Sequence, residues 1–290
     1  MKRILLSIAV IATLIIVGTA CSSKNKTQEG SEKSLVFGFS PGPYSDLFKL
    51  AIQPELEAKG YKIKVIEFTD WVTPNIALAN KEIDANIFQH SRYLAQFSKD
   101  KGVELSPVIA IPTASFGLYT KKLKATSAEE LKTELTKGKS ITIPHDPTNL
   151  ARALIFLQKQ GLITIKADID ATRASEKDIV ENPYGLVFTP VDAAQLPRTL
   201  DTSELSVISG NYAISAGIRL STSLAGESLE LKTENIVAVR TTDLDEPFVE
   251  DIKEIIQSEA FKKVVENTDY DFASFQRPQW YVQQWEIQNK

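Results

Sequence analysis

The segment Pro144–Arg152, PHDPTNLAR, holds the polar residues best suited to bind a small anion. Asp146-Pro147 is a typical helix start, because aspartate caps the helix and proline fits its first turn. The N-terminus of a helix offers unpaired N–H groups and a partial positive charge. Arg152 can grip a carboxylate at two points, and Asn149 can bond beside it. The pattern predicts binding of a carboxylate or a phosphate; the alternative is a capping aspartate and an arginine in a surface ion pair.

A second set of candidates consists of aromatic residues and a histidine near the apolar segment 83–88. Phe88, His90 and Tyr93 fall within six residues of one another, and Trp71 precedes them. Rings and an imidazole can form an apolar slot with a polar tip, which suits a long or sulfur-containing side chain. The alternative is that these rings only fill the core.

A third candidate is the polar tip Gly210-Asn211-Tyr212, which follows the apolar segment 205–208 and could hydrogen-bond an amino group; a plain turn would look the same. His90 and His145 are the only histidines, and no His-x-His or Cys-x-x-Cys spacing occurs. No Ser–His–Asp set can be assigned from the spacing. We therefore expect no metal site, no cofactor and no catalytic residue.

The elements that must position these residues alternate from residue 35 onward between strand-like and helix-like segments. The expected strands are residues 35–39, 62–68, 83–88, 139–143, 185–191, 205–208 and 235–240. The expected helices are residues 44–59, 73–80 with Thr73 as N-cap, 93–101, a helix opened by the capping box 127–130, 147–161, 246–258 and 260–267. This alternation predicts an α/β fold with mostly parallel sheets.

The length of this alternating region fits either one large domain or two lobes, and we favour two lobes. The βα series starts afresh in the middle third, and the last strand and helices look like a return to the first lobe. We place lobe 1 at residues 34–120, lobe 2 at 121–232, and the return with the C-terminal tail at 233–290. Two such lobes leave a ligand cleft between them, near strand ends and helix N-termini.

The first 21 residues have the pattern of a bacterial lipoprotein signal. Residues 1–3 are a basic start, residues 4–17 are largely apolar, and small residues lead to Cys21, the only cysteine. The apolar run is shorter than a membrane span of about 20 residues, so we expect residues 1–20 to be cleaved. Cys21 would then carry a diacylglycerol and acyl chains such as palmitate. The alternative is an ordinary secretory signal, since Gly18 stands where a large apolar residue is usual.

Residues 21–33 are rich in Ser, Lys, Glu and Gln, a composition that predicts a flexible tether. The formal net charge of −4 becomes −6 once Lys2 and Arg3 are removed with the signal. A mildly acidic domain without a basic stripe is a poor nucleic-acid binder. We expect its stability to come from core burial, because the single cysteine is committed to the lipid.

Five motifs, in order and spaced over about residues 35–265, resemble the methionine-binding lipoproteins of ABC importers. They are Asp84-Ala-Asn-Ile-Phe-Gln-His90 with Tyr93-Leu94, Pro144–Asn149 with Arg152-Ala-Leu154, Ile179–Pro183, Ala194–Arg198 and Gly210–Ala213. The resemblance implies a two-lobed, periplasmic-binding-protein-like type II fold. It implies a lipid-anchored protein on the extracytoplasmic face of the cell membrane that delivers methionine, L or D, to a permease driven by an ATPase.

Carried over residue by residue, the resemblance gives Arg152 the ligand carboxylate, with help from Asn149. It gives Asn211 and Asn235 the polar α-carbon end of the ligand. The side-chain slot would be lined by Trp71, Phe88, His90 and Tyr93. The chain differs from the family pattern at Trp71, commonly a tyrosine, and at Ser91-Arg92 and His145.

The sequence allows three kinds of alternative hypothesis. A binding protein for a methionine-containing dipeptide or another amino acid would use the same clamp. An enzyme on this scaffold would use His90 as a base, and an adhesin or interaction protein would leave the cleft residues without a role. We favour an amino-acid-binding protein that is not an enzyme and that works as a monomer.

Overall fold

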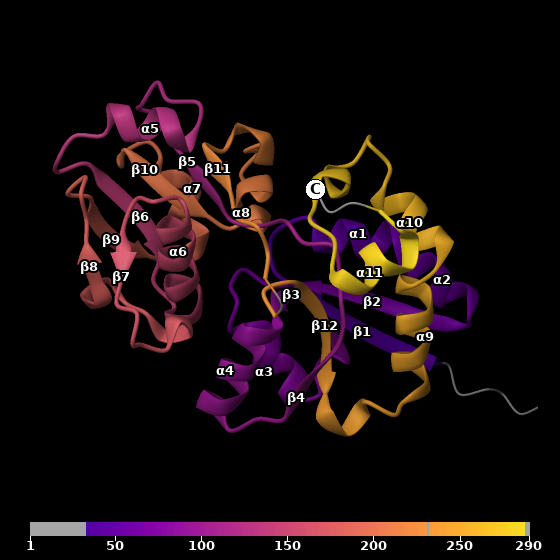
Figure 1. The fold of residues 1–290 in the computed structure, drawn as a ribbon. Coiled ribbons are helices and arrows are strands. Elements are labelled where there is room, and N and C mark those ends of the chain that lie inside the picture. The colour runs from indigo at the N-terminus through magenta and orange to yellow at the C-terminus, as the bar shows by residue number, and fades with distance from the viewer. Residues whose placement is uncertain (1–32, 231, 288–290) are drawn as a thin grey trace, which may run out of the picture. The chain divides into compact units, whose positions relative to one another are not determined.

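The computed structural model describes residues 33–230 and 232–287 (Figure 1). The expected signal peptide, Cys21 and all of the expected tether except residue 33 lie outside the described residues. The strands are β1 (Lys33–Phe39), β2 (Tyr61–Glu67), β3 (Ala85–His90), β4 (Leu105–Ala110), β5 (Gly117–Tyr119), β6 (Ser140–Pro144), β7 (Thr164–Ile165), β8 (Ile179–Glu181), β9 (Val187–Val191), β10 (Leu205–Ile208), β11 (Ala225–Gly226) and β12 (Asn235–Arg240). The α-helices are α1 (Tyr44–Ala51), α2 (Gln53–Ala58), α3 (Thr73–Ala79), α4 (Ser91–Lys101), α5 (Ala128–Glu134), α6 (Pro147–Lys159), α7 (Leu196–Thr199), α8 (Gly210–Ser215), α9 (Pro247–Ile256), α10 (Glu259–Val265) and α11 (Gln279–Trp285).

The first sheet has the strand order β2-β1-β3-β12-β4. β1 runs parallel to β2 and β3, whereas β12 returns late in the chain and lies antiparallel between β3 and β4. Figure 1 shows β12, in orange, among the violet strands of the N-terminal third. We call this sheet, with α1–α4 and α9–α11, the first lobe.

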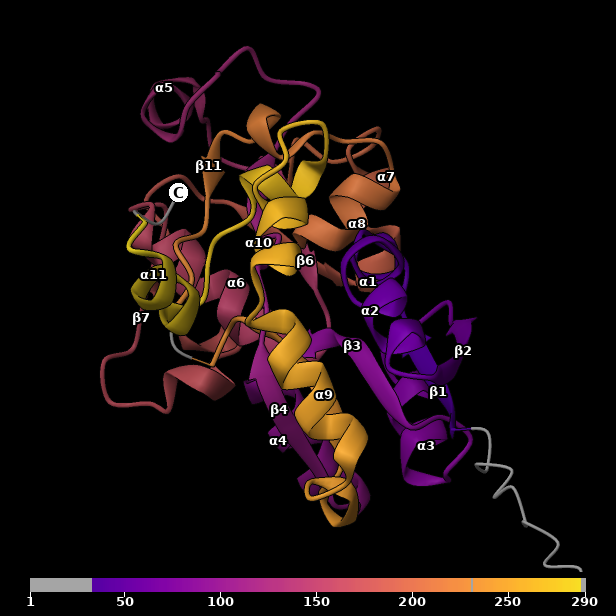
Figure 2. The same ribbon diagram turned by 90° about the vertical axis from the view of Figure 1, so that its right-hand side faces the viewer.

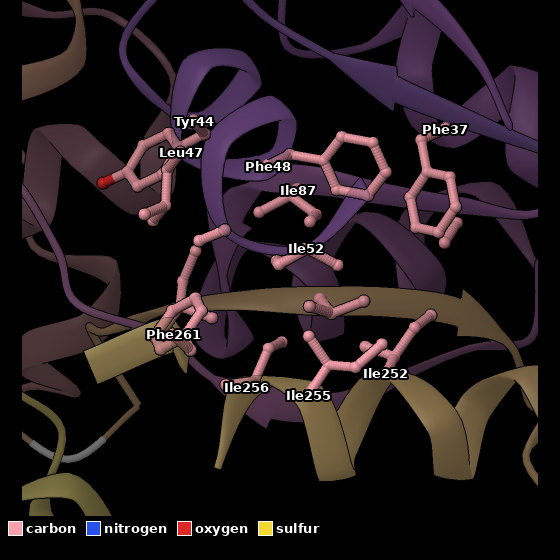
Figure 3. Close-up of a cluster of buried hydrophobic side chains, with 14 of the residues drawn as sticks. Phe37, Tyr44, Leu47, Phe48, Ile52, Ile87, Ile252, Ile255, Ile256 and Phe261 are labelled. Carbon is pink, nitrogen blue, oxygen red and sulfur yellow. The ribbon is translucent and has the colours of Figure 1, made fainter. Parts of the chain in front are cut away.

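Hydrophobic residues on the two faces of the first sheet pack into two separate cores. Val237 and Val239 of β12 pack with α1, α9 and α10, whereas Ile236 and Ala238 face α3 and α4. The alternation follows from the two-residue period of a strand. In Figure 3, the isoleucines of α9 point toward Phe48 of α1 and toward Ile52, which follows α1.

The second sheet has the order β11-β5-β10-β6-β9, and with α5–α8 it makes up the second lobe. β6 is parallel to β9 and β10, whereas β5 is antiparallel to β10 and β11. Leu205 and Val207 of β10 pack toward α6, and Ile208 packs toward α7 and α8. The described part of the chain is thus an α/β protein with two lobes, as the sequence predicted.

The chain passes between the lobes twice, along residues 111–116 and residues 227–234, and we call these the connecting segments. The first runs from β4 to β5 and the second from β11 to β12. β7 and β8 form a small separate ribbon.

Local signals explain several helix boundaries, and three expectations were wrong in detail. The predicted single helix 44–59 is two helices, broken at Ile52 just before Gln53-Pro54. Thr73 does not cap α3: the Asp70 carboxylate accepts from the backbone N–H groups of Val72 and Thr73 instead. Only half of the capping box 127–130 forms, since Ser127 accepts from the Glu130 N–H while the Glu130 carboxylate binds Thr126.

Candidate ligand-binding site between the lobes

One cavity brings together all eight site residues named from the sequence. The space between its walls, open solvent included, is about 360 Å³. The first lobe contributes the end of β3 and the start of α4, and the second lobe contributes α6 and α8. The lining residues are Trp71, Phe88, Gln89, His90, Tyr93, Ala114, Phe116, Asn149, Arg152, Ser209, Asn211 and Asn235.

Arg152, in the second turn of α6, makes a buried ion pair, whereas the sequence alternative placed such a pair at the surface and named no partner. Its Nε and Nη2 donate to the two carboxylate oxygens of Glu227 at 2.7 and 2.6 Å. The guanidinium lies 4.2 Å from the centre of the Phe116 ring. Arg152 and Glu227 are only 5% and 7% exposed. This two-point pair uses one edge of the guanidinium and leaves the Nη1 amino group for another partner.

His90 links the two lobes and is held in one tautomer. Its Nδ1 accepts from the Tyr93 N–H at 3.1 Å, so its Nε2 carries the proton and donates to Asn149 Oδ1 at 3.1 Å. Burial and the nearby Arg152 charge lower the pKa of His90 to about 3. The imidazole is therefore neutral, with both ring nitrogens engaged, which makes it a poor base.

Asn149 extends this chain to the start of α6. Its Nδ2 donates to both carboxylate oxygens of Asp146, at 3.1 and 3.3 Å, and its N–H is capped by the same carboxylate. Burial raises the pKa of Asp146. The predicted capping aspartate is confirmed, and it also orients the amide that meets His90.

Aromatic rings enclose the first-lobe side of the cavity. The Tyr93 ring lies edge-on to Trp71 and to Phe88, with centroids 6.3 and 6.4 Å apart. The Tyr93 hydroxyl donates to the Trp71 carbonyl at 3.2 Å. Trp71 also packs on Tyr212 of α8, 5.0 Å between centroids, so the slot spans both lobes.

Asn211 and Asn235 are oriented by backbone carbonyls. Asn211 Nδ2 donates to the Pro41 carbonyl at 3.1 Å, and Asn235 Nδ2 donates to the Phe88 carbonyl at 3.2 Å. Because each amide donates through Nδ2, its Oδ1 is left as an acceptor. Gly210-Asn211-Tyr212 begins helix α8 and is not a turn. The cavity thus combines a cation, amide acceptors and an aromatic slot, as a zwitterionic amino acid requires.

One spacing that typifies hydrolases was overlooked in the sequence. Gly38–Gly42 reads Gly-x-Ser-x-Gly between β1 and α1. The Ser40 hydroxyl, however, is buried and donates to the Asp70 carbonyl at 2.8 Å. His90, whose two ring nitrogens bond elsewhere, does not serve it, so this segment is a structural turn.

The comparison with protein families decides the classification. The family model described as NlpA lipoprotein matches residues 35–280. The chain belongs to the NlpA lipoprotein family. This NlpA-family chain is a substrate-binding lipoprotein and not an enzyme, as expected.

Relatives of this NlpA-family chain are similar over nearly their full length. A probable D-methionine-binding lipoprotein MetQ of Vibrio cholerae is 34% identical, and the match covers 91% of this chain and 93% of the relative. The D-methionine-binding lipoprotein MetQ of Escherichia coli is 31% identical, over 89% and 90%. Among solved structures, a nutrient binding protein from Burkholderia cenocepacia bound to methionine matches with a TM-score of 0.74 and 36% identity, covering 80% of this chain and 95% of the other.

Within residues 33–230 and 232–287, no group of three or more His, Cys, Asp or Glu side chains could hold a metal ion. No helix in the same ranges is both long enough and apolar enough to cross a membrane.

Proposed function

We propose that this protein is the substrate-binding component of an ABC importer and that it captures methionine, L or D, or a closely related amino acid. The observation that carries this proposal is the cavity between the lobes, where Arg152, the two oriented asparagines and the aromatic slot converge. The names of the V. cholerae and E. coli relatives, and the methionine-bound B. cenocepacia structure, support the same ligand.

Each lining residue has a role that follows from its bonds. The Nη1 side of Arg152 meets the ligand carboxylate, and Asn149 lies beside it. The Oδ1 atoms of Asn211 and Asn235 accept from the ligand ammonium group. The thioether lies among the rings of the slot, where sulfur–aromatic contacts are favourable. These rings belong to Trp71, Phe88, His90 and Tyr93.

Binding couples to closure of the lobes. His90–Asn149, Pro41–Asn211 and Trp71–Tyr212 are contacts between lobes, available only when the lobes are together. A ligand that touches both lobes favours that arrangement. Analogues that lack the carboxylate or the ammonium group leave a buried partner unpaired and bind much more weakly.

Isothermal titration of L- and D-methionine into residues 33–290, refolded to remove any bound ligand, tests the proposal. We expect a Kd below about 10 μM, equivalent to more than roughly 6.8 kcal/mol, and loss of binding in Arg152→Ala. No heat with either enantiomer would exclude methionine. A signal with a methionine-containing dipeptide alone would identify a peptide-binding protein instead.

We further propose that Cys21 carries the lipid anchor on the extracytoplasmic face of the membrane, after removal of residues 1–20, and that residues 21–33 form the tether. The working unit is a monomer that docks on the permease of the importer, whose ATPase supplies energy. Substituting Cys21→Ser should move the protein from the membrane fraction to the soluble fraction. Retention in the membrane fraction would refute the anchor.

A further inference from the structure

Gln276 contacts both connecting segments between the lobes. Its backbone pairs with Thr113 of the first segment through two hydrogen bonds of 2.9 and 3.0 Å. Its side-chain Oε1 accepts from the Leu229 N–H of the second segment at 2.7 Å. Its Nε2 donates to the backbone carbonyl of Glu227 and, at 3.2 Å, to the hydroxyl of Ser115. One amide side chain therefore ties the two segments together.

Glu227, held at its backbone by Gln276, is the residue that holds Arg152. Its carboxylate accepts from Arg152 Nε and Nη2 and, at 3.2 Å, from the Phe116 N–H. We call this series of contacts, from Gln276 through Glu227 to the Arg152 guanidinium at the cavity, the relay. Each of its hydrogen bonds is buried or partly buried, where a misplaced charge is costly.

The residues beside Gln276 fix it to the first lobe. Phe275 and Arg277 are 0% and 2% exposed. Phe275 belongs to the core that contains α1 and α9, and Arg277 donates to Glu266 and to the Phe272 carbonyl. In Figure 2 the C-terminal helices α9 and α10 lie next to each other, and both contribute to this core. Gln276 thus presents its amide from a rigid support.

We propose that Gln276 is a positioning residue for ligand binding, which acts through Glu227 to hold Arg152 in the orientation that meets the ligand carboxylate. The C-terminal segment is thereby part of the binding machinery, although it does not line the cavity. This inference rests on the proposed function in one respect only, namely that the ligand carries a carboxylate that binds Arg152.

The test compares methionine with methioninol, in which an alcohol replaces the carboxylate, on the full mature protein. In Gln276→Ala we expect the affinity for methionine to fall roughly tenfold, because a misplaced Arg152 loses a buried hydrogen bond to the charged ligand carboxylate. The affinity for methioninol, which has no carboxylate, should change less than about twofold. The control is Gln284→Ala, which also removes an amide bond from the C-terminal segment, to the Gln257 carbonyl within the first lobe. It should alter neither affinity.

An equal loss for both compounds would mean that Gln276 only stabilises the fold, and would overturn the proposal. If Gln276→Ala does not fold, Gln276→Glu serves instead. It keeps an acceptor for the Leu229 N–H but cannot donate to the Glu227 carbonyl, so it should show the same selective loss.

Hydrogen exchange of the ligand-free protein separates this inference from the proposed function. The Leu229 N–H bonds to Gln276 directly, whereas the Phe116 N–H bonds only to Glu227. Gln276→Ala should speed exchange at both amides, and Gln284→Ala at neither. Unchanged exchange at Phe116 would overturn the relay even if methionine binds. If wild type binds no methionine, the proposed function fails while the exchange result still decides the relay.

Discussion

The imidazole Nε2 of His90 lies 3.1 Å from the amide Oδ1 of Asn149, and this hydrogen bond joins the two lobes at the cavity. Because the Tyr93 N–H occupies Nδ1, only the neutral Nε2–H tautomer can make both bonds. Protonation of Nδ1 would break the bond from the Tyr93 N–H, which lies in the first turn of α4. The lobe contact therefore depends on an imidazole that stays neutral.

Acid should destabilise the protein through this histidine. The unfolded imidazole takes up a proton as the pH falls through 6.5, whereas the folded one resists until about 3. Between these values the unfolded state binds more protons, so the free energy of unfolding falls as the pH falls, by up to roughly 1 kcal/mol per pH unit. Denaturant titrations at pH 4 to 7 should show a shallower dependence in His90→Gln. If the free energy of unfolding depends equally on pH in the two proteins, the imidazole is not held neutral. Asp146, whose pKa burial raises, is present in both proteins, so its titration does not account for a difference between them.

Gly42→Ala should interfere with closure. Gly42 has φ +137°, and a Cβ there would lie 2.7 Å from the Cβ of Asn211 in the other lobe. We expect methionine affinity to fall at least about tenfold, because both the strained backbone and the clash oppose the lobe contact. Titration calorimetry measures the change.

The matched control for this change is Gly60→Ala. Gly60 also has a positive φ, +89°, but no atom lies within 4 Å of a Cβ built there. This variant should lose roughly 1 kcal/mol of unfolding free energy and keep its affinity. A similar affinity loss in both variants would show that backbone strain, and not contact with Asn211, is responsible.

Removing one partner of the Arg152–Glu227 pair should cost more than removing both. Glu227→Ala leaves a buried guanidinium unpaired and should lower the unfolding free energy by roughly 3 to 5 kcal/mol. The double variant Arg152→Ala, Glu227→Ala should be less destabilised than the two single losses summed. Urea unfolding of the four proteins in this cycle checks the coupling, and strict additivity would argue against a buried ion pair.

Trp71 should report ligand binding by fluorescence. Its ring packs on Tyr212 of the opposite lobe at 5.0 Å, whereas Trp280 and Trp285 pack in the first lobe. We expect methionine to change the emission of the wild type, and this change to disappear in Trp71→Phe. A signal that persists in Trp71→Phe but disappears in Trp285→Phe would place the conformational change in the C-terminal segment.

Local signals in the sequence were sufficient for much of this fold. Asp146-Pro147 predicted the start of α6, and the apolar segments 205–208 and 235–240 coincide with β10 and β12. β4 and β5 were missed: β4 contains Pro107, and β5 has only three residues, Gly117–Tyr119. Short strands of this kind are specified by their neighbours in the sheet and not by their own pattern.

Tertiary contacts defined the part of the site that could not be foreseen. Glu227 lies in a polar stretch that reads as a loop, and its partner Arg152 is 75 residues away. Gln276 likewise has no local pattern that sets it apart from the other glutamines of the tail. Both side chains acquire their roles only when the two connecting segments come together.

The position of β12 has a consequence for how the protein is made. A chain synthesised from its N-terminus presents β1 to β4 long before residues 235–240 emerge, and until then β3 and β4 each lack a neighbour in the first sheet. Pairing across so long a stretch of sequence is slow, and exposed strand edges invite aggregation. The first lobe therefore completes its folding only after the second lobe has been synthesised, and a fragment that ends before residue 235 should not yield a stable lobe.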